Sequence, residues 1–199
     1  MKNLIFSFFV LALLQSCSGS GGSSGATSGG GSTTSPIPEA SSVYAKMDGV
    51  YNPLNTNCIN QNNEHFKIVL IKTNNEFSVL KTLFDDVMCS GASQTISLAS
   101  VYIFVSAKVN PLNDGSDLTD VSLIDSQIAI LNPSYVSDFN SQYLYGYNNW
   151  IVGNAKSVVD RSRLTGESPI FISGTLTSFS FKLIGNSSLI FNGVQYNKQ

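Results

Sequence analysis

The stretch at residues 64–84, EHFKIVLIKTNNEFSVLKTLF, decides the fold class. Apolar side chains recur at every second position through residues 64–72 and again through 76–84, which is the spacing of strands with two different faces. The Thr-Asn-Asn triplet at 73–75 separates the two runs, and Asn tolerates positive φ, so a β-hairpin is predicted. The side chains expected to share a face are Phe66, Ile68 and Leu70 on one side of the first run, Val69 and Ile71 on its other side, and Phe77, Val79 and Leu83 in the second run.

The same alternation continues on both sides of this hairpin. Gly49 interrupts the most N-terminal run, where a bulge or bend is expected. In a later run the alternation passes through Ile124, Ile128 and Ile130. The predicted strands cover residues 43–51, 98–109, 118–131, 178–183 and 189–191, of which the last is expected to be the final strand.

Only one place favours a helix. Asn132 is suited to cap it, Pro133 fits the first turn, and residues 134–139 would follow. No run of ten or more residues keeps a helical period, so the predicted class is all-β. We expect a compact antiparallel barrel or sandwich of seven to nine strands with at most one short helix, spanning residues 39–199.

The N-terminal segment has a different composition. Lys2 precedes an eleven-residue run at 4–14 that is apolar except for Ser7, and this run is shorter than the roughly twenty residues that a membrane-spanning helix needs. Ser16 and Cys17 follow, and residues 18–35 contain only Ser, Gly, Thr and one Ala. A run of this kind is a signal-peptide core followed by a linker of random-coil composition.

This order of features resembles the signal of bacterial lipoproteins. The resemblance implies a signal peptide at residues 1–16, an acylated Cys17 as the new N-terminus, and a Ser/Gly/Thr-rich linker over 17–38. Two or more acyl chains hold a protein stably on a membrane, so a lipid anchor in the cell envelope is expected. Ser18 favours the outer membrane by analogy with enteric lipoproteins. The alternative is an ordinary secretory signal that contains a Cys by chance.

The number and distribution of charged residues argue against nucleic acid and anionic membranes as partners. The chain has 11 basic and 13 acidic residues, and removing Lys2 leaves a net charge near −3. No cluster of Lys and Arg is present, so we expect no nucleic-acid partner and no polybasic membrane contact.

If Cys17 carries lipid, Cys58 and Cys89 remain. Outside the cytoplasm an even pair predicts a disulfide, which would close a loop of about thirty residues. The rival interpretation is a pair of thiolate metal ligands, although the sequence offers no further Cys or clustered His to complete such a site.

A second resemblance covers about residues 43–192. The order DGVY at 48–51, Cys58 soon after it, a hairpin, CSG at 89–91 and an Asn-rich segment that reaches Trp150 is similar to small lipocalin-like bacterial lipoproteins. It implies a short barrel in which a disulfide links the first strand region to a following loop. The early Gly-x-Trp of that family is Gly-Val-Tyr in this chain.

Residues that could carry chemistry are scattered. His65 is the only histidine and is expected to be a solvated strand residue. Three acids crowd one loop, but the calcium-loop spacing fails at Leu112, so turn chemistry is favoured over a calcium site. Neighbouring carboxylates in a strand point to opposite sides, which argues against paired acid–base catalysis. These acids are Asp114, Asp117 and Asp120 in the loop, and Asp85 and Asp86 as the neighbouring pair.

The densest charge run is Asp-Arg-Ser-Arg at 160–163. Outside the Ser/Gly/Thr-rich linker, neither a Gly-x-Ser-x-Gly elbow nor a phosphate-binding loop occurs in the sequence. We interpret the run as a polar loop between strands. The alternative is that Arg161 or Arg163 contacts an anionic partner.

Four aromatic residues form the most suggestive group. Tyr143, Tyr145, Tyr147 and Trp150 would place three phenols on one face of a strand. Such a stripe is suited to stack on sugars or on a partner protein, because Tyr and Trp are favoured at interfaces. The alternative is that these side chains form part of the barrel wall.

The sequence therefore predicts a membrane-anchored lipoprotein with a non-enzymatic β-barrel domain that binds a small apolar ligand or an envelope partner. No catalytic residue, metal site or cofactor is predicted. The first alternative is a structural or adhesive surface module with a filled core, and an undetected hydrolase is a further one. A preformed apolar pocket would favour the binding domain over the filled module.

Overall fold

The computed structural model describes residues 47–54, 58–109 and 116–199. Cys17, the predicted signal peptide and the predicted linker lie outside the described residues. So do the first part of the predicted strand at 43–51 and the loop at 110–115 with Asp114. All described residues belong to one compact unit.

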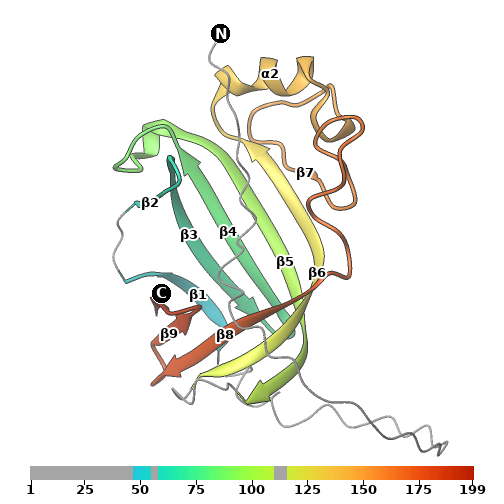
Figure 1. Cartoon of the computed structure of the whole chain (residues 1–199). Coiled ribbons are helices and arrows are strands. Elements are labelled where there is room, and N and C mark those ends of the chain that lie inside the picture. The colour runs from blue at the N-terminus through green and yellow to red at the C-terminus, as the bar shows by residue number, and fades with distance from the viewer. Residues whose placement is uncertain (1–46, 55–57, 110–115) are drawn as a thin grey trace, which may run out of the picture. The chain divides into compact units, whose positions relative to one another are not determined.

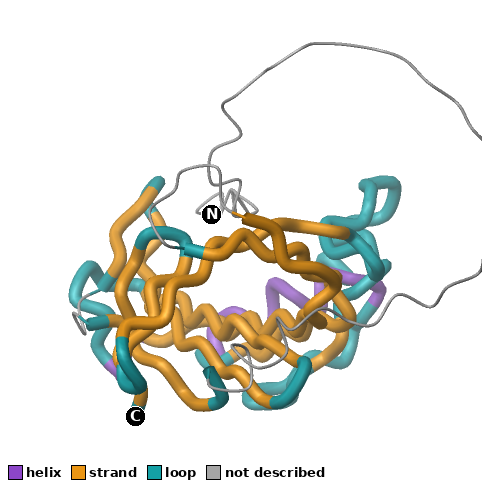
Figure 2. The backbone as a smooth tube through the Cα atoms, turned by 90° about the horizontal axis from the view of Figure 1, so that it is seen from below, coloured by secondary structure: helices purple, strands orange, loops and turns teal. Residues whose placement is uncertain are grey.

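Eight antiparallel strands form a closed barrel, which confirms the predicted all-β class. The ring closes because β1 pairs with β3, where Tyr51 lies opposite Leu70. Figure 1 shows the strands, and Figure 2 shows the ring of strands from below. In spatial order the strands are β1 (Gly49–Pro53), β10 (Val194–Lys198), β9 (Ser188–Phe191), β8 (Leu176–Ile184), β6 (Asp117–Ile130), β5 (Gln94–Val109), β4 (Glu76–Phe84) and β3 (Glu64–Thr73).

The barrel has a closed end and an open end, because β3 and β6 each pair with one strand at one end and with a different strand at the other. The first residues of β3 pair with the short strand β2 (Ile59–Gln61), and its last residues pair with β1. Likewise β6 pairs with β8 along its first half and with β7 (Lys156–Ser157) near its end. The ring is therefore complete only where β1 and β8 take part. At the other end β2 and β7 are the outer strands of a curved sheet.

Aromatic side chains fill the closed end. The ring of Phe77 lies 5.1 to 6.3 Å from four other rings, measured between centroids. Most of these pairs are tilted or edge-to-face, the arrangements that the charge distribution of aromatic rings prefers. The four neighbours are Phe104, Phe179, Phe181 and Phe191.

Near the open end the inner face also carries charge. Lys81 forms a 2.7 Å ion pair with Glu64, and its ammonium lies 4.2 Å from the centroid of the Phe66 ring. Lys81 stands opposite Ile68 in the β3–β4 pairing, so it shares the inner face with these residues. The inner face therefore carries charge at both ends, because the buried Lys72 lies beside the Phe104 ring at the closed end.

The hairpin predicted at residues 64–84 is present. β3 and β4 pair from His65 opposite Phe84 to Thr73 opposite Glu76. Phe66, Phe77 and their alternating neighbours point inward.

Two predictions about strands are wrong. Ile124 does not share a face with Ile128, because a register shift in the β5–β6 pairing inserts it as an extra residue, and its side chain is 39% exposed. The strand at 188–191 is not the last one. Asn192 and Gly193, with φ of 47° and 80°, form a tight turn into β10. An Asn-Gly pair between alternating runs is the usual sign of such a hairpin.

The predicted short helix is confirmed. It consists of a 3-10 turn, Pro133–Tyr135, and the α-helix α2, Val136–Ser141. The side chain of Asn132 accepts a hydrogen bond from the backbone N–H of Ser134 and so caps the first turn. This helix stands at the open end of the barrel and begins the long connection from β6 to β8 (Figure 1).

Candidate functional site

The connection from β6 to β8 contains the aromatic group that the sequence singled out. The structure shows that the predicted strand at 143–147 is wrong, because residues Leu144–Gly146 form a 3-10 turn. Tyr143 and Tyr145 both have φ of 56°, a left-handed conformation that interrupts an extended chain. The three phenols therefore do not lie on one face, and each has its own environment.

Trp150 belongs to the core of this connection. Its side chain is 1% exposed and packs edge-on against Phe139 of α2, with 5.3 Å between centroids. The side-chain amide of Asn140 binds the backbone of Trp150 twice, accepting from its N–H at 2.7 Å and donating to its carbonyl at 3.1 Å. The indole N–H donates to the carbonyl of Leu144. Trp150 is thus a packing residue of the β6–β8 connection and does not lie in the barrel wall.

Tyr147 also makes its contacts within the protein. Its hydroxyl donates to the carbonyl of Ser157 at 3.0 Å. The guanidinium of Arg161 lies 4.5 Å and the ammonium of Lys156 4.6 Å from the centroid of its ring, and both are cation–π contacts. Tyr147 therefore links the aromatic segment to the charged run at 160–163.

Two further hydrogen bonds hold these segments together. The backbone N–H of Tyr145 donates to the carbonyl of Arg163 at 2.9 Å, and Arg161 donates to the carbonyl of Tyr145 at 3.4 Å. The two segments were separate candidates in the sequence, and the structure places them side by side.

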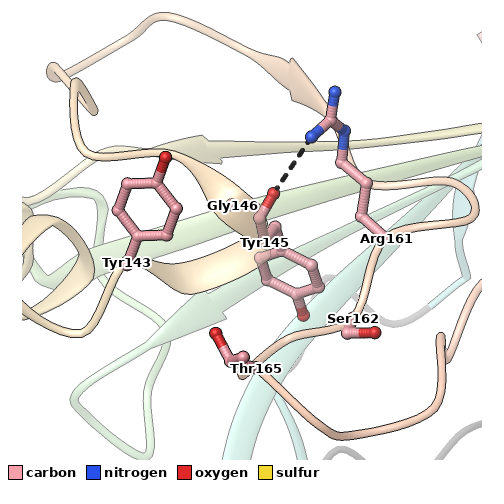
Figure 3. Close-up of a pocket in the computed structure, with 6 residues that line it drawn as sticks. All are labelled: Tyr143, Tyr145, Gly146, Arg161, Ser162 and Thr165. Carbon is pink, nitrogen blue, oxygen red and sulfur yellow. Dashed lines mark hydrogen bonds between the residues drawn. The ribbon is translucent and has the colours of Figure 1, made fainter.

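A cavity of about 220 Å³ opens where they meet (Figure 3). It is smaller than the roughly 300–1,000 Å³ of sites for drug-sized ligands. Its wall combines aromatic rings, two aliphatic hydroxyls and a guanidinium. The lining residues are Tyr143, Tyr145, Gly146, Arg161, Ser162 and Thr165.

Tyr145 has an unusual hydroxyl. The residue is 1% exposed, and its phenol oxygen makes no hydrogen bond with any described residue. Burial raises the pKa of this phenol to about 12, with Arg163 opposing the shift and Glu167 adding to it. The group is therefore protonated at neutral pH and lacks an acceptor. Leaving such a buried group without a partner costs on the order of 1–3 kcal/mol.

Figure 3 shows the Tyr145 hydroxyl pointing toward the segment that carries Ser162 and Thr165. Tyr143 differs from Tyr145 in that its side chain is 51% exposed. Its ring stands on the other side of the cavity in this view. The site thus combines an exposed ring with a buried, unpartnered donor.

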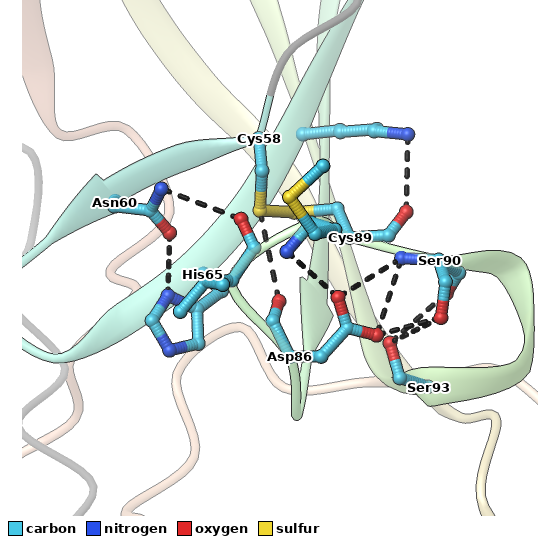
Figure 4. Close-up of a disulfide and its surroundings, with 10 residues drawn as sticks. Cys58, Asn60, His65, Asp86, Cys89, Ser90 and Ser93 are labelled. Carbon is cyan, nitrogen blue, oxygen red and sulfur yellow. Dashed lines mark hydrogen bonds between the residues drawn. A yellow bond between two sulfur atoms is a disulfide. The ribbon is translucent and has the colours of Figure 1, made fainter.

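The second candidate region surrounds the disulfide (Figure 4). Cys58 and Cys89 are joined, with 5.2 Å between their Cα atoms, and the bond ties the start of β2 to the turn after β4. Asp86 organises that turn, since its carboxylate accepts from the Ser90 hydroxyl at 2.6 Å and the Met88 N–H at 2.7 Å. These bonds hold the pKa of Asp86 well below its usual range, the Ser90 hydroxyl being the largest cause.

The other polar candidates have structural partners. His65 Nδ1 lies 2.5 Å from Asn60 Oδ1 across the β2–β3 pair. Asp85 accepts a hydrogen bond from the Tyr135 hydroxyl at 2.6 Å. Asp117 and Asp120 lie in the strand β6, so the prediction that they belong to a loop is wrong, and Asp120 accepts from two serine hydroxyls. Across residues 47–54, 58–109 and 116–199 no three His, Cys, Asp or Glu side chains gather as a metal site would require.

Fold and site together define a small antiparallel barrel with a loop-built cavity at one end. No family model matches the sequence, and no curated protein matches it. Among the described residues, no helix has the length and apolar character needed to cross a bilayer.

Proposed function

We propose that the protein is a lipid-anchored envelope protein whose barrel domain binds a ligand through the cavity between residues 143–146 and 161–165. The observation that carries the proposal is the Tyr145 hydroxyl, a buried donor without an acceptor beside a cavity. A ligand acceptor at this position would remove the cost of the unpaired group. The barrel strands β6 and β8 hold the two ends of the connection that contains these loops.

The sequence predicts a small apolar ligand or an envelope partner for the barrel domain, and the cavity indicates where such binding would take place. The closed end is filled by phenylalanine rings, and the cavity lies in the β6–β8 connection. Binding is therefore proposed for the loops, while the barrel acts as a scaffold. A structural or adhesive module remains the second candidate, since the aromatic filling of the closed end favours it.

The anchor is tested by changing Cys17→Ala. The variant should leave the membrane fraction and lose the mass of its acyl chains, because cysteine sulfur is the attachment point that the signal resemblance implies. A Cys17→Ala protein that stays on membranes at the wild-type level contradicts the anchor.

Binding is tested with the full acylated protein and fractions of its own envelope. A bound ligand raises the melting temperature, because it stabilises only the folded state. The variant Tyr143→Asn removes the exposed ring, and Asn tolerates the left-handed backbone there. Ile151→Asn is the matched control, since Ile151 is 57% exposed and does not line the cavity.

We expect at least one fraction to raise the melting temperature of the wild type and of Ile151→Asn but not of Tyr143→Asn. If every fraction acts equally on all three proteins, the cavity is not a binding site and the structural module is favoured.

A further inference from the structure

We propose that the ligand of this cavity is a single neutral pyranose ring, either a free sugar or the end of a glycan. The inference rests on the proposed function and names the chemical class of its ligand. It follows from the size of the cavity, its hydrogen-bonding groups, its exposed aromatic ring and its balanced charge.

The size excludes large ligands. The cavity has a volume of about 220 Å³ and is open to solvent on one side. This volume suits one six-membered ring with its substituents and is too small for a diacyl lipid. It is also below the range of drug-sized sites.

The polar groups favour a polyol. The hydroxyls of Ser162 and Thr165 can each donate and accept, and Tyr145 contributes a donor without an acceptor. Arg161 has five N–H donors, of which the described residues take one, through the carbonyl of Tyr145. Sugar hydroxyls supply acceptors for these donors and donors for the serine and threonine oxygens. An apolar ligand would leave the Tyr145 hydroxyl unpaired.

The exposed ring of Tyr143 completes the argument. An aromatic face carries negative partial charge, and the axial C–H groups on one face of a pyranose carry positive partial charge. Half of the Tyr143 side chain is accessible, so a sugar can stack there while its hydroxyls reach the polar wall.

Charge favours a neutral sugar over an acidic one. The segment at 160–167 contains two arginines and two acids, so its net charge is zero. Asp160 accepts from the N–H of Ser173 and Glu167 from the N–H of Leu164, so backbone donors hold both carboxylates. Arg161 is the one charged residue of the lining, and the two acids of its segment offset the charge of the two arginines.

The test titrates the full acylated protein, in a detergent without a sugar headgroup, with glucose, galactose and N-acetylglucosamine. Saturation-transfer NMR and calorimetry report binding, with glucuronate as the charged comparison and glycerol as a polyol without a ring. We expect saturable binding of at least one neutral pyranose at millimolar concentration and no saturable binding of glycerol or glucuronate.

The decisive variant is Tyr145→Phe, which removes only the buried hydroxyl. We expect the affinity for the sugar to fall about tenfold or more, while the melting temperature without ligand rises or stays unchanged. These opposite effects separate a binding group from a packing group and show that the variant folds. Tyr143→Asn should also weaken binding, and Ile151→Asn should not.

The sugar assignment is overturned if no neutral pyranose saturates at tens of millimolar, if glucuronate alone binds, or if Tyr145→Phe binds as well as the wild type. If an envelope fraction still stabilises the protein through Tyr143, the proposed function survives and only the ligand class is wrong. If neither sugars nor envelope fractions depend on Tyr143, both proposals fail.

Discussion

The ammonium of Lys72 lies 2.9 Å from a carboxylate oxygen of Asp48, and the lysine side chain is completely buried. Asp48 is 43% exposed, so the two partners of this ion pair differ in their access to water. Lys72 also donates to the carbonyl of Asn74 and lies 5.3 Å from the centroid of the Phe104 ring. The pair joins the residue before β1 to the end of β3, next to the seam where the barrel closes.

This asymmetry predicts unequal effects of the two substitutions. Asp48→Ala leaves a buried ammonium without its counter-ion and should lower the free energy of unfolding by about 3 kcal/mol. Lys72→Met keeps the aliphatic shape and leaves a carboxylate that water can reach, so the loss should stay below about 1 kcal/mol. Urea unfolding measures both values. Equal losses in the two variants would contradict the argument.

Acid should weaken the fold through two carboxylates. The hydrogen bond and charge of Lys72 lower the pKa of Asp48, and the Ser90 hydroxyl lowers that of Asp86. Each group is more acidic in the folded chain, so its contribution is complete above the unfolded value of about 3.9 and is lost as the pH falls below it.

Melting temperatures measured between about pH 5 and pH 2 test this direction. Asp86→Asn should flatten part of the acid limb, whereas Asp138→Asn, an exposed acid of α2, should leave the slope unchanged. If the wild-type protein becomes more stable as the pH falls, the predicted direction of the pH dependence is wrong.

The disulfide should be a substantial source of stability. Cys58 and Cys89 are 31 residues apart, and closing a loop of this length stabilises a fold by about 3–4 kcal/mol in the chain-entropy model. Replacing both cysteines with serine should lower the urea midpoint accordingly, and reductant should have no further effect on the variant. Unreduced peptide mapping of the wild type should show the linked pair. Free thiols at both positions would remove this contribution.

Trp150 offers a direct report on the loops. It is the only tryptophan in the chain, so its fluorescence describes the β6–β8 connection alone. Asn140→Ala removes both hydrogen bonds to the Trp150 backbone and should cost about 1–2 kcal/mol, with an emission shift to longer wavelength. The matched control is Asn148→Ala, at an exposed position in the same connection. Identical spectra for the two variants would contradict a structural role of Asn140.

The barrel could be predicted because period-two alternation is a local signal. Phe66, Ile68 and Leu70 share a face in any sheet that buries one side. The short helix could be predicted for the same reason, because the effects of Asn132 and Pro133 on the helix start are local. The final strand was missed even though Asn192 and Gly193 signal a hairpin. The extra residue at Ile124 is set by pairing with β5, which no local pattern reveals.

The site was predicted only in part. The sequence indicates Tyr143 and Tyr145 as candidates in an aromatic segment and Arg161 as a candidate in a separate charged segment. Tyr143 and Tyr145 have left-handed backbone conformations that interrupt the predicted strand. The alternation of side chains in a sequence carries no information about φ. The contact between the aromatic and charged segments depends on the path of the whole β6–β8 connection. The unpartnered hydroxyl of Tyr145 becomes visible only once that path is known.

β3 and β6 each pair with two different strands, and this arrangement determines which part of the domain can move when a ligand binds. At the closed end, where β1 and β8 complete the ring, local unfolding of a strand must break its pairing on both sides and disturb the phenylalanine cluster. At the opposite end β7 pairs through only two residues, so its amides should exchange with deuterium at a lower opening free energy. Plasticity is therefore confined to the half of the domain that carries the loops, and their rearrangement need not strain the rest of the fold.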